Sequence, residues 1–437
     1  MKIISLVLLC LSITVQAGPA IQTWETSNGA MVYFVPAPEL PMADIRVVFD
    51  AGSAREGKKW GLAAMTSALL TEGADGLSAE QISEHFEDVG AQIGSGSLRD
   101  MAYVEVRTIT EQKNFATALD GLAKVITKPD FPQAAFERQK KRTLIGLQQK
   151  KQSPSSIAQD AFYNAVYGDH PYAHPSEGNE QTVSQITRDD LTAFYKKWFT
   201  AKNAIVAIVG DLNTEQAKQA AEKVIGQLPV GKAAPCLPQV QDLTEEKTVR
   251  IYHPSSQTTI YVGQPGMKRG DPDYYALYVG NHSLGGSGLV SRLSDEVRER
   301  RGLSYSVYSY FLPMREKGPF MSGMQTRNDQ VEEGLNVLKE TISRYINEGQ
   351  TEKEFTASVK NITGGFPLRI DNNRKIVEYL SMIGFYNLPL DYLDTFISKV
   401  ESLTIDQTRE AMKRRLDPNK MVTVIVGGSV EKNKEGS

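Results

Sequence analysis

Residues 186–210, ITRDDLTAFYKKWFTAKNAIVAIVG, and residues 403–427, LTIDQTREAMKRRLDPNKMVTVIVG, align without a gap at an offset of 217. In both copies a Thr precedes an amphipathic run, a short break follows, and an apolar stretch ends in Gly. A Thr in that place is typical of a helix N-cap, and a short apolar run bounded by turn residues is typical of a buried strand. The two stretches therefore predict one helix–strand unit that occurs twice, which indicates a duplicated domain.

A second pair of matching segments supports the duplication. The same apolar stripe of helical period occurs at an offset of 216, as Phe115, Leu119, Leu122 and Ile126 and again as Val331, Leu335, Leu338 and Ile342. Between the copies, residues 229–246 begin with PVGKAAPCLP, and this Pro-rich composition predicts a linker. We therefore expect an N-terminal domain over 20–228, a C-terminal domain over 247–430 and a polar tail over 431–437.

The order of elements indicates the fold class. Asp44–Asp50 and Tyr103–Ile109 alternate apolar and polar residues as strands do, and helices are expected over about 114–127, 133–151 and 155–166. Strands that are grouped apart from helices favour layered α+β architecture over alternating βαβ units. We expect an α+β protein of two homologous domains, each a mixed, mostly antiparallel sheet covered by helices on one face.

Length and charge narrow the classes of function. The chain has 437 residues, which favours two or more domains, and its formal net charge is −3. It has no long run of Lys or Arg, so neither a nucleic acid nor an anionic membrane surface is an expected partner.

The first 17 residues, MKIISLVLLCLSITVQA, are predicted to form a cleaved signal peptide. Lys2 provides the charged start, the apolar core follows, and Val15-Gln16-Ala17 is a small-residue cleavage site. The apolar run is too short to span a bilayer comfortably, so no stable membrane insertion is expected. Cleavage leaves a net charge of −4 and Cys236 as the one cysteine, which cannot form an internal disulfide. An exported chain without disulfides predicts a periplasmic location.

Residues 50–108 resemble the amino-terminal half of the pitrilysin-type zinc peptidases, the inverzincins, which include insulin-degrading enzyme and mitochondrial processing peptidase. The resemblance is carried by Ala51-Gly52-Ser53, Glu56, Gly61-Leu62-Ala63, Gly73, Gly90-Ala91-Gln92-Ile93 and Arg99-Asp100. It implies the processing-peptidase-like metallohydrolase fold for the whole chain.

The zinc motif of that family is missing from this sequence. The family carries H-x-x-E-H on the helix that follows Gly-Leu-Ala, where two His bind zinc and the Glu activates water. The matching positions are Ala64, Ser67 and Ala68, which offer neither a metal ligand nor a general base. The family's third ligand, a Glu, would fall near Ile145, and residues 140–149 contain no carboxylate. The chain is therefore expected to bind no metal at this site.

The histidines do not suggest another zinc site. The five are His85, His170, His174, His253 and His282. His170 and His174 lie four residues apart, but Pro171 between them disfavours a helical ligand face. We therefore interpret them as structural residues of a loop.

Residues 284–310, LGGSGLVSRLSDEVRERRGLSYSVYSY, resemble the carboxy-terminal half of the same family. The Gly-rich turn Gly285, Gly286, Ser287 and Gly288 lacks the Lys-Ser/Thr of a P-loop, so we interpret its glycines as allowing close approach of the backbone. Local patterning predicts a helix capped by Ser287 with a buried stripe of Leu289, Leu293 and Val297, a helix stop at Gly302, and a strand from Leu303.

The resemblance implies a role for Arg298 and Tyr305. In the family an Arg and a Tyr seven residues apart contact substrate across the cleft and help to stabilise the tetrahedral intermediate, work that suits two hydrogen-bond donors. Taken alone, an Arg near a helix C-terminus is also typical of surface charge, and a Tyr near a strand is typical of a core or rim position.

In this family the working unit is four such domains around a chamber, in one chain or two. A two-domain chain with the Arg–Tyr pair but without the zinc motif resembles the zinc-less subunit of mitochondrial processing peptidase. The resemblance implies a non-catalytic, substrate-binding subunit of a two-chain periplasmic zinc metallopeptidase, inactive alone. Its partner would be a homologous chain with intact H-x-x-E-H and bound zinc, and its substrates peptides or unfolded proteins. Two alternatives remain, a pseudopeptidase that binds peptides or proteins without cutting them, and a scaffold subunit of an assembly.

Overall fold

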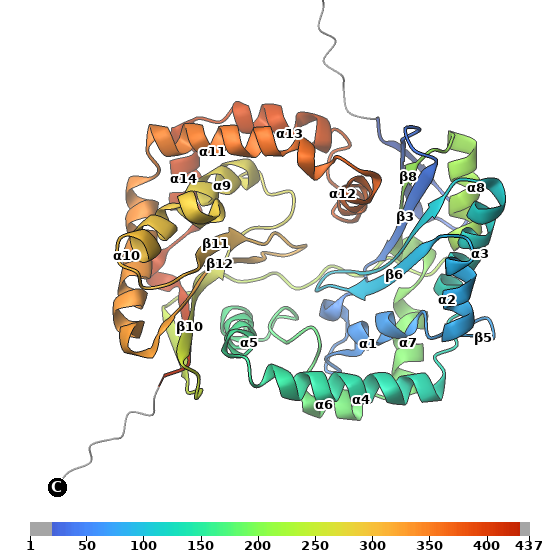
Figure 1. Cartoon of the computed structure of the whole chain (residues 1–437), viewed down its shortest axis with the longest axis horizontal. Helices are drawn as coiled ribbons and strands as arrows, with labels where there is room; N and C mark the ends of the chain where they lie inside the picture. Colours follow the sequence, from blue (N-terminus) through green and yellow to red (C-terminus); the bar gives the residue numbers. More distant parts are fainter. Residues whose placement is uncertain (1–19, 429–437) are drawn as a thin grey trace, which may run out of the picture.

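The structure is a computed structural model that describes residues 20–428 (Figure 1). The predicted signal peptide at 1–17 and the polar tail at 431–437 lie outside the described residues. Two sheets, one from each half of the chain, stand apart in the molecule, and helices surround them (Figure 1). Within residues 20–428, no helix has the length and apolar character that a membrane crossing requires.

Each sheet is mixed and mostly antiparallel, as predicted. The first has the strand order β1-β2-β8-β3-β7-β6, and the second has the order β11-β12-β10-β13-β9. One pair in each sheet is parallel, β2 with β8 and β13 with β9. The strands of the first sheet are β1 Gln22–Glu25, β2 Met31–Pro36, β3 Met42–Phe49, β6 Gln92–Ser97, β7 Ala102–Ile109 and β8 Ala204–Gly210. Those of the second are β9 Lys247–Ile251, β10 Gln257–Pro265, β11 Val307–Phe311, β12 Pro319–Arg327 and β13 Val422–Val426.

The two halves differ in the number of α-helices that the described residues form, eight in the first and six in the second. The first half contains α1 Leu62–Leu69, α2 Ala79–Glu87, α3 Gln112–Thr127, α4 Gln133–Lys150, α5 Pro154–Tyr167, α6 Glu180–Gln185, α7 Arg188–Trp198 and α8 Thr214–Ile225, with a small hairpin of β4 Gly73–Ala74 and β5 Leu77–Ser78. The second contains α9 Tyr274–Asn281, α10 Val331–Glu348, α11 Glu352–Gly365, α12 Asn373–Phe385, α13 Tyr392–Glu401 and α14 Ile405–Arg415.

The repeated helix–strand unit is confirmed. Thr187 and Thr404 each accept a hydrogen bond from the backbone N–H three residues on, and both close a capping box. The helices that they cap, α7 and α14, lead into β8 and β13. Each of these strands pairs antiparallel with the matching strand of its own sheet, β8 with β3 and β13 with β10. The duplication therefore extends from sequence to topology.

Each half also lends one helix to the sheet of the other half. The helix α5 packs on β10 and β13 of the second sheet, and α12 packs on β3 and β8 of the first (Figure 1). Phe162 of α5 is fully buried, and its ring meets that of Tyr261 edge-on at 6.3 Å. Leu380 of α12 is fully buried in one apolar cluster with Val209. The predicted helices on one face are present, and the exchanged helices cover the opposite face.

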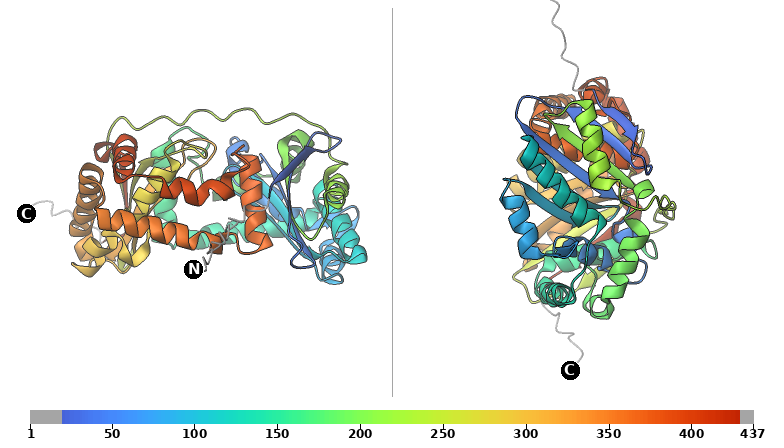
Figure 2. Two further views of the ribbon diagram at one scale, coloured as in Figure 1. Left: turned by 90° about the horizontal axis from the view of Figure 1, so that it is seen from above. Right: turned by 90° about the vertical axis from the view of Figure 1, so that its right-hand side faces the viewer.

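The segment 229–246 runs as an extended chain from one half to the other over the outside of the molecule (Figure 2). Leu237 and Val240 of this segment are buried in the apolar cluster that also contains residues of α5. The carbonyl of Pro235 accepts a hydrogen bond from Arg55, and that of Pro238 is bonded to the ring of His170. The segment is therefore docked along most of its length.

Candidate functional site

The helix α1, which carries the positions of the lost zinc motif, is held at its start by Glu56. The Glu56 carboxylate accepts the N–H groups of Gly61 at 3.0 Å and Ala63 at 2.8 Å, two of the groups that a helix start leaves unpaired. Burial raises the pKa of Glu56 to about 8, although these N–H groups and Arg99 act in the opposite direction.

His174 lies beside Glu56, and Trp60 packs on the ring of His174. Nδ1 of His174 lies 3.6 Å from Oε1 of Glu56, and the His174 ring stacks on Trp60 with centroids 5.2 Å apart. Burial lowers the pKa of His174, so its ring is neutral near pH 7. His170 lies apart from this contact, bonded to the linker carbonyl of Pro238. Both rings therefore serve loop packing.

The three positions of the zinc motif offer no ligands. Ala64 and Ala68 present methyl groups, and both are partly exposed. Ser67 is buried, its hydroxyl has no partner among the described residues, and its carbonyl accepts a hydrogen bond from Ser95 of β6. Residues 20–428 contain no group of three or more His, Cys, Asp or Glu placed to hold a metal ion. The zinc that the fold family implies does not fit these side chains.

A cleft of about 640 Å³ opens beside Ala64, between α1 and α4. Arg142, Gly146 and Lys150 of α4 line it, with Glu177 at its edge. Ile145, near which the third ligand was expected, is 47% exposed and does not line the cleft. The cleft is thus lined by two cationic side chains, those of Arg142 and Lys150, and by one carboxylate, that of Glu177.

The Gly-rich turn of the second half departs from the predicted helix. Residues 282–286 and 294–299 form π-helical turns, and a short 3₁₀ turn at 288–290 separates them. The predicted cap at Ser287 is wrong, because its side chain accepts no backbone N–H, and Ser291 accepts that of Ser294 instead. The buried stripe is wrong at Leu289, which is 65% exposed, and right at Leu293 and Val297.

The glycines explain this break. Gly288 has φ +62°, in the left-handed region, so one continuous helix cannot run through it. A Cβ at Gly285 would lie 2.4 Å from the hydroxyl of Ser309 on β11, which confirms the predicted close approach of the backbone. Gly302 also has a positive φ and ends the helical segment as predicted, but the strand begins at Val307 rather than at Leu303.

The structure places Arg298 and Tyr305 on either side of this stop. The Arg298 side chain makes one ion pair among the described residues, with its neighbour Glu299 at 3.5 Å. Tyr305 lies in the loop before β11 and is 88% exposed. No hydrogen bond joins the two within the described chain, so both donors remain available to a ligand or a partner.

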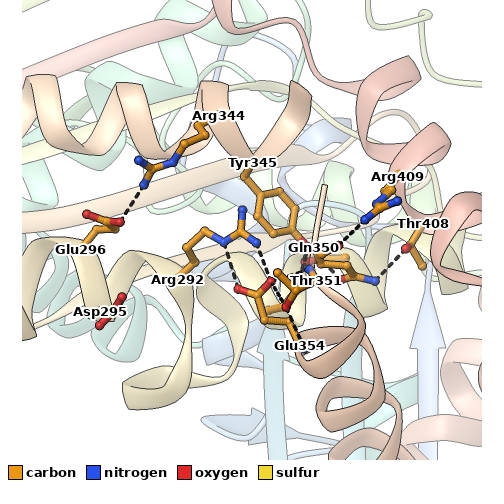
Figure 3. Close-up of polar contacts among 12 residues, drawn as sticks. Arg292, Asp295, Glu296, Arg344, Tyr345, Gln350, Thr351, Glu354, Thr408 and Arg409 are labelled. Carbon is orange, nitrogen blue, oxygen red and sulfur yellow. Dashed lines mark hydrogen bonds and ion pairs between the residues drawn. The ribbon is translucent and has the colours of Figure 1, made fainter. Parts of the chain in front are cut away.

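A groove of about 800 Å³ lies next to the Gly-rich turn, and the sequence did not suggest it. Its floor is a polar network in which Arg292 donates to both carboxylate oxygens of Glu354, and Glu296 pairs with Arg344 at 2.7 Å (Figure 3). Behind it the Tyr345 hydroxyl donates to the carbonyl of Gly280. These partners are far apart in sequence, so no local pattern marks them.

Comparisons with known proteins agree with this geometry. Residues 32–180 match "Insulinase (Peptidase family M16)", and residues 185–362 match "Peptidase M16 inactive domain". The chain is 25% identical to "Uncharacterized zinc protease YmxG" of Bacillus subtilis, over 80% of this chain and 85% of that one. It is also 25% identical to "Non-peptidase homolog YmxG" of Helicobacter pylori, over 89% of each.

Solved structures give the same assignment. The crystal structure of a peptidase M16 inactive domain from Pseudomonas fluorescens is 40% identical, with a TM-score of 0.91 over 94% of this chain and 98% of that one. A protease from Helicobacter pylori shares the fold at 18% identity, with a TM-score of 0.86 over 93% of this chain and 99% of that one. With its two homologous halves and its vacated zinc motif, the chain belongs to peptidase family M16, as a member without the catalytic metal ligands.

Proposed function

We propose that this chain is the non-catalytic, substrate-binding subunit of a two-chain zinc metallopeptidase of the bacterial periplasm. The observation that carries the proposal is a contrast between the two halves. The first half has Ala64 and Ala68 in place of the two zinc-binding His and Ser67 in place of the Glu that activates water. The second half presents Arg298 and Tyr305 with accessible donors.

The division of labour follows from that contrast. A homologous partner with intact H-x-x-E-H would supply the zinc and the carboxylate that activates water. Arg298 and Tyr305 would donate hydrogen bonds to the oxyanion that forms on the scissile carbonyl. The substrates would be peptides or unfolded proteins. A cleaved signal peptide at 1–17 would place this chain in the periplasm, which fractionation of the native host checks.

The central experiment is affinity purification of the mature chain from its native host, with identification of what is retained. We expect a chain of similar size with H-x-x-E-H, and zinc-dependent cleavage of peptides by the complex. The chain purified alone should hold no stoichiometric zinc and cut no peptide. A chelator-sensitive, zinc-restored activity of the lone chain would overturn the proposal.

Two substitutions test the proposed donors in the complex. Arg298→Ala or Tyr305→Phe should lower peptide turnover by roughly ten- to a thousand-fold, because oxyanion donors are lost. Arg327→Ala and Tyr252→Phe change exposed residues outside the Gly-rich segment and should leave turnover unchanged. Wild-type kinetics in both donor variants would remove this role from the pair.

An alternative is a pseudopeptidase that binds peptides or proteins and releases them uncut. The relative from Helicobacter pylori named a non-peptidase homolog favours it. Purification that retains peptides but never a zinc-bearing homologue would select this alternative.

A further inference from the structure

The cleft beside Ala64 is lined by two cations, Arg142 and Lys150, and by one carboxylate, Glu177. One face of α4 lines it with Gln139, Arg142, Thr143, Gly146, Leu147 and Lys150, a spacing of three and four residues that places them on one side of a helix. Zinc sites use lone pairs and carboxylates, whereas guanidinium and ammonium groups repel cations and attract anions. With two cations against one carboxylate, the cleft favours an anion over a metal ion.

Of the two cations that line the cleft, Arg142 is the one without an ion pair among residues 20–428. It is exposed, and among residues 20–428 no carboxylate lies within ion-pair distance of it. Lys150, two turns further along α4, donates a hydrogen bond to Asp160 at 3.3 Å and lies 3.6 Å from the Glu177 carboxylate. The side chain of Glu177 is 65% exposed, so solvent screens its pairing with Lys150.

The space between these cations is open. Gly146 lies one turn from each of them, and a Cβ added to it would have no neighbour within 4 Å. On the opposite wall, Ala64 presents only a methyl group. Ser156 and Gln159 of α5 also line the cleft. A planar anion can enter, and a guanidinium can bind it through two parallel hydrogen bonds.

We infer that the cleft between α1 and α4 binds a carboxylate of the substrate peptide, with Arg142 as the main ligand and Lys150 as the second. The inference rests on the proposed function only in taking a peptide as the ligand. The carboxylate is either the peptide's C-terminus or an Asp or Glu side chain. In this way the cleft serves as an anchor for peptides that present a carboxylate.

The test is isothermal titration of the full mature chain with three short peptides of one neutral sequence. The first has a free C-terminus, the second is amidated, and the third is amidated with one internal Glu. We expect the first, the third or both to bind about ten-fold or more tightly than the second, since a charge-assisted hydrogen bond contributes that much. The difference should shrink as salt is raised. Equal affinities for all three peptides would overturn the inference.

Two variants and a control assign the effect to the cleft. Arg142→Gln should remove the preference for a carboxylate. Gly146→Glu should also remove it, because the new carboxylate lies between Arg142 and Lys150 and occupies their donors. Lys141→Gln removes an exposed charge of α4 that does not line the cleft, and should keep the preference. A preference that survives both cleft variants would place the carboxylate site elsewhere and end the inference.

The results separate this inference from the proposed function. If the complex cuts peptides in an Arg298-dependent way but shows no preference for a carboxylate, the proposed function is supported and the inference about the cleft is wrong. If the carboxylate preference depends on Arg142 but the chain retains no zinc-bearing partner, the inference about the cleft is supported and the two-chain function is wrong.

Discussion

At the scale of single residues, Glu56 is buried at the start of the helix from which the zinc ligands were lost. Its carboxylate accepts the N–H groups of Gly61 and Ala63. The start of this helix is therefore held in place although the helix carries no zinc ligands. The titratable groups that face Glu56 are His174, at 3.6 Å, and the positively charged Arg99. A buried carboxylate in this setting makes stability depend on pH.

We predict that the stability of the wild-type chain falls as pH rises from 6.5 to 8. Burial raises the pKa of Glu56 from 4.5 in the unfolded chain to about 8, so in this window the folded state holds a proton that the unfolded state has lost. One such group contributes at most about 1.4 kcal/mol per pH unit. His174, whose pKa is lowered, changes stability in the opposite direction, but only below its ordinary value of 6.5.

Urea unfolding of wild type and Glu56→Gln at several pH values checks this expectation. The variant has no titrating group at this position, so its free energy of unfolding should vary less between pH 6.5 and 8. Glu25→Gln changes an exposed carboxylate and serves as the control. Parallel pH profiles for wild type and Glu56→Gln would show that Glu56 does not titrate in this window.

At the scale of elements, local patterns carried most of the prediction. The helix expected over 133–151 is α4, Gln133–Lys150, and the strand expected over Tyr103–Ile109 is β7, Ala102–Ile109. The exception is the Gly-rich segment, where a helix with a single stripe was expected and broken π-helical and 3₁₀ turns were found. The conformation of its backbone is set by the positive φ of Gly288 and by close contact with β11. Neither of these can be detected from helical periodicity.

The two matching caps should contribute equally to stability. Thr187→Ala and Thr404→Ala each remove a hydroxyl that accepts a backbone N–H, from Asp190 and from Gln407. Each should lower the free energy of unfolding by about 0.5–2 kcal/mol, measured by urea denaturation. Serine at either position should restore most of the loss. Thr192→Ala, within the exposed face of α7, should have a smaller effect, and a loss there as large as at the caps would count against capping as the cause.

At the scale of the whole molecule, the exchanged helices and one buried carboxylate join the halves. Asp100, in the loop between β6 and β7, is 3% exposed. It accepts hydrogen bonds from the Tyr172 hydroxyl at 2.5 Å, the backbone N–H of Arg315 at 2.7 Å and the Tyr386 hydroxyl at 2.9 Å. Two of these donors belong to the second half, so Asp100 links the two sheets.

We predict that Asp100→Asn destabilises the chain by about 1–3 kcal/mol. An amide provides one acceptor oxygen, so at least one of the three buried donors loses its partner. Asp329→Asn, at an exposed ion pair, is the matched control. In urea, the midpoint for Asp100→Asn should fall, and the transition should broaden or split if the halves unfold separately. An unchanged midpoint would mean that the Asp100 hydrogen bonds do not contribute to holding the halves together.

Much of this protein was determined by the sequence alone, because the signals are local. Repeated helix caps and apolar stripes predict the duplicated fold. With Ala64, Ser67 and Ala68 in its three positions, the zinc motif offers no metal ligand in any fold. Only the tertiary structure decided which helix covers which sheet, the Asp100 junction and the cationic cleft beside Ala64. These features join residues that lie tens to hundreds of positions apart, and their proximity depends on packing between elements, which periodicity along one chain does not encode.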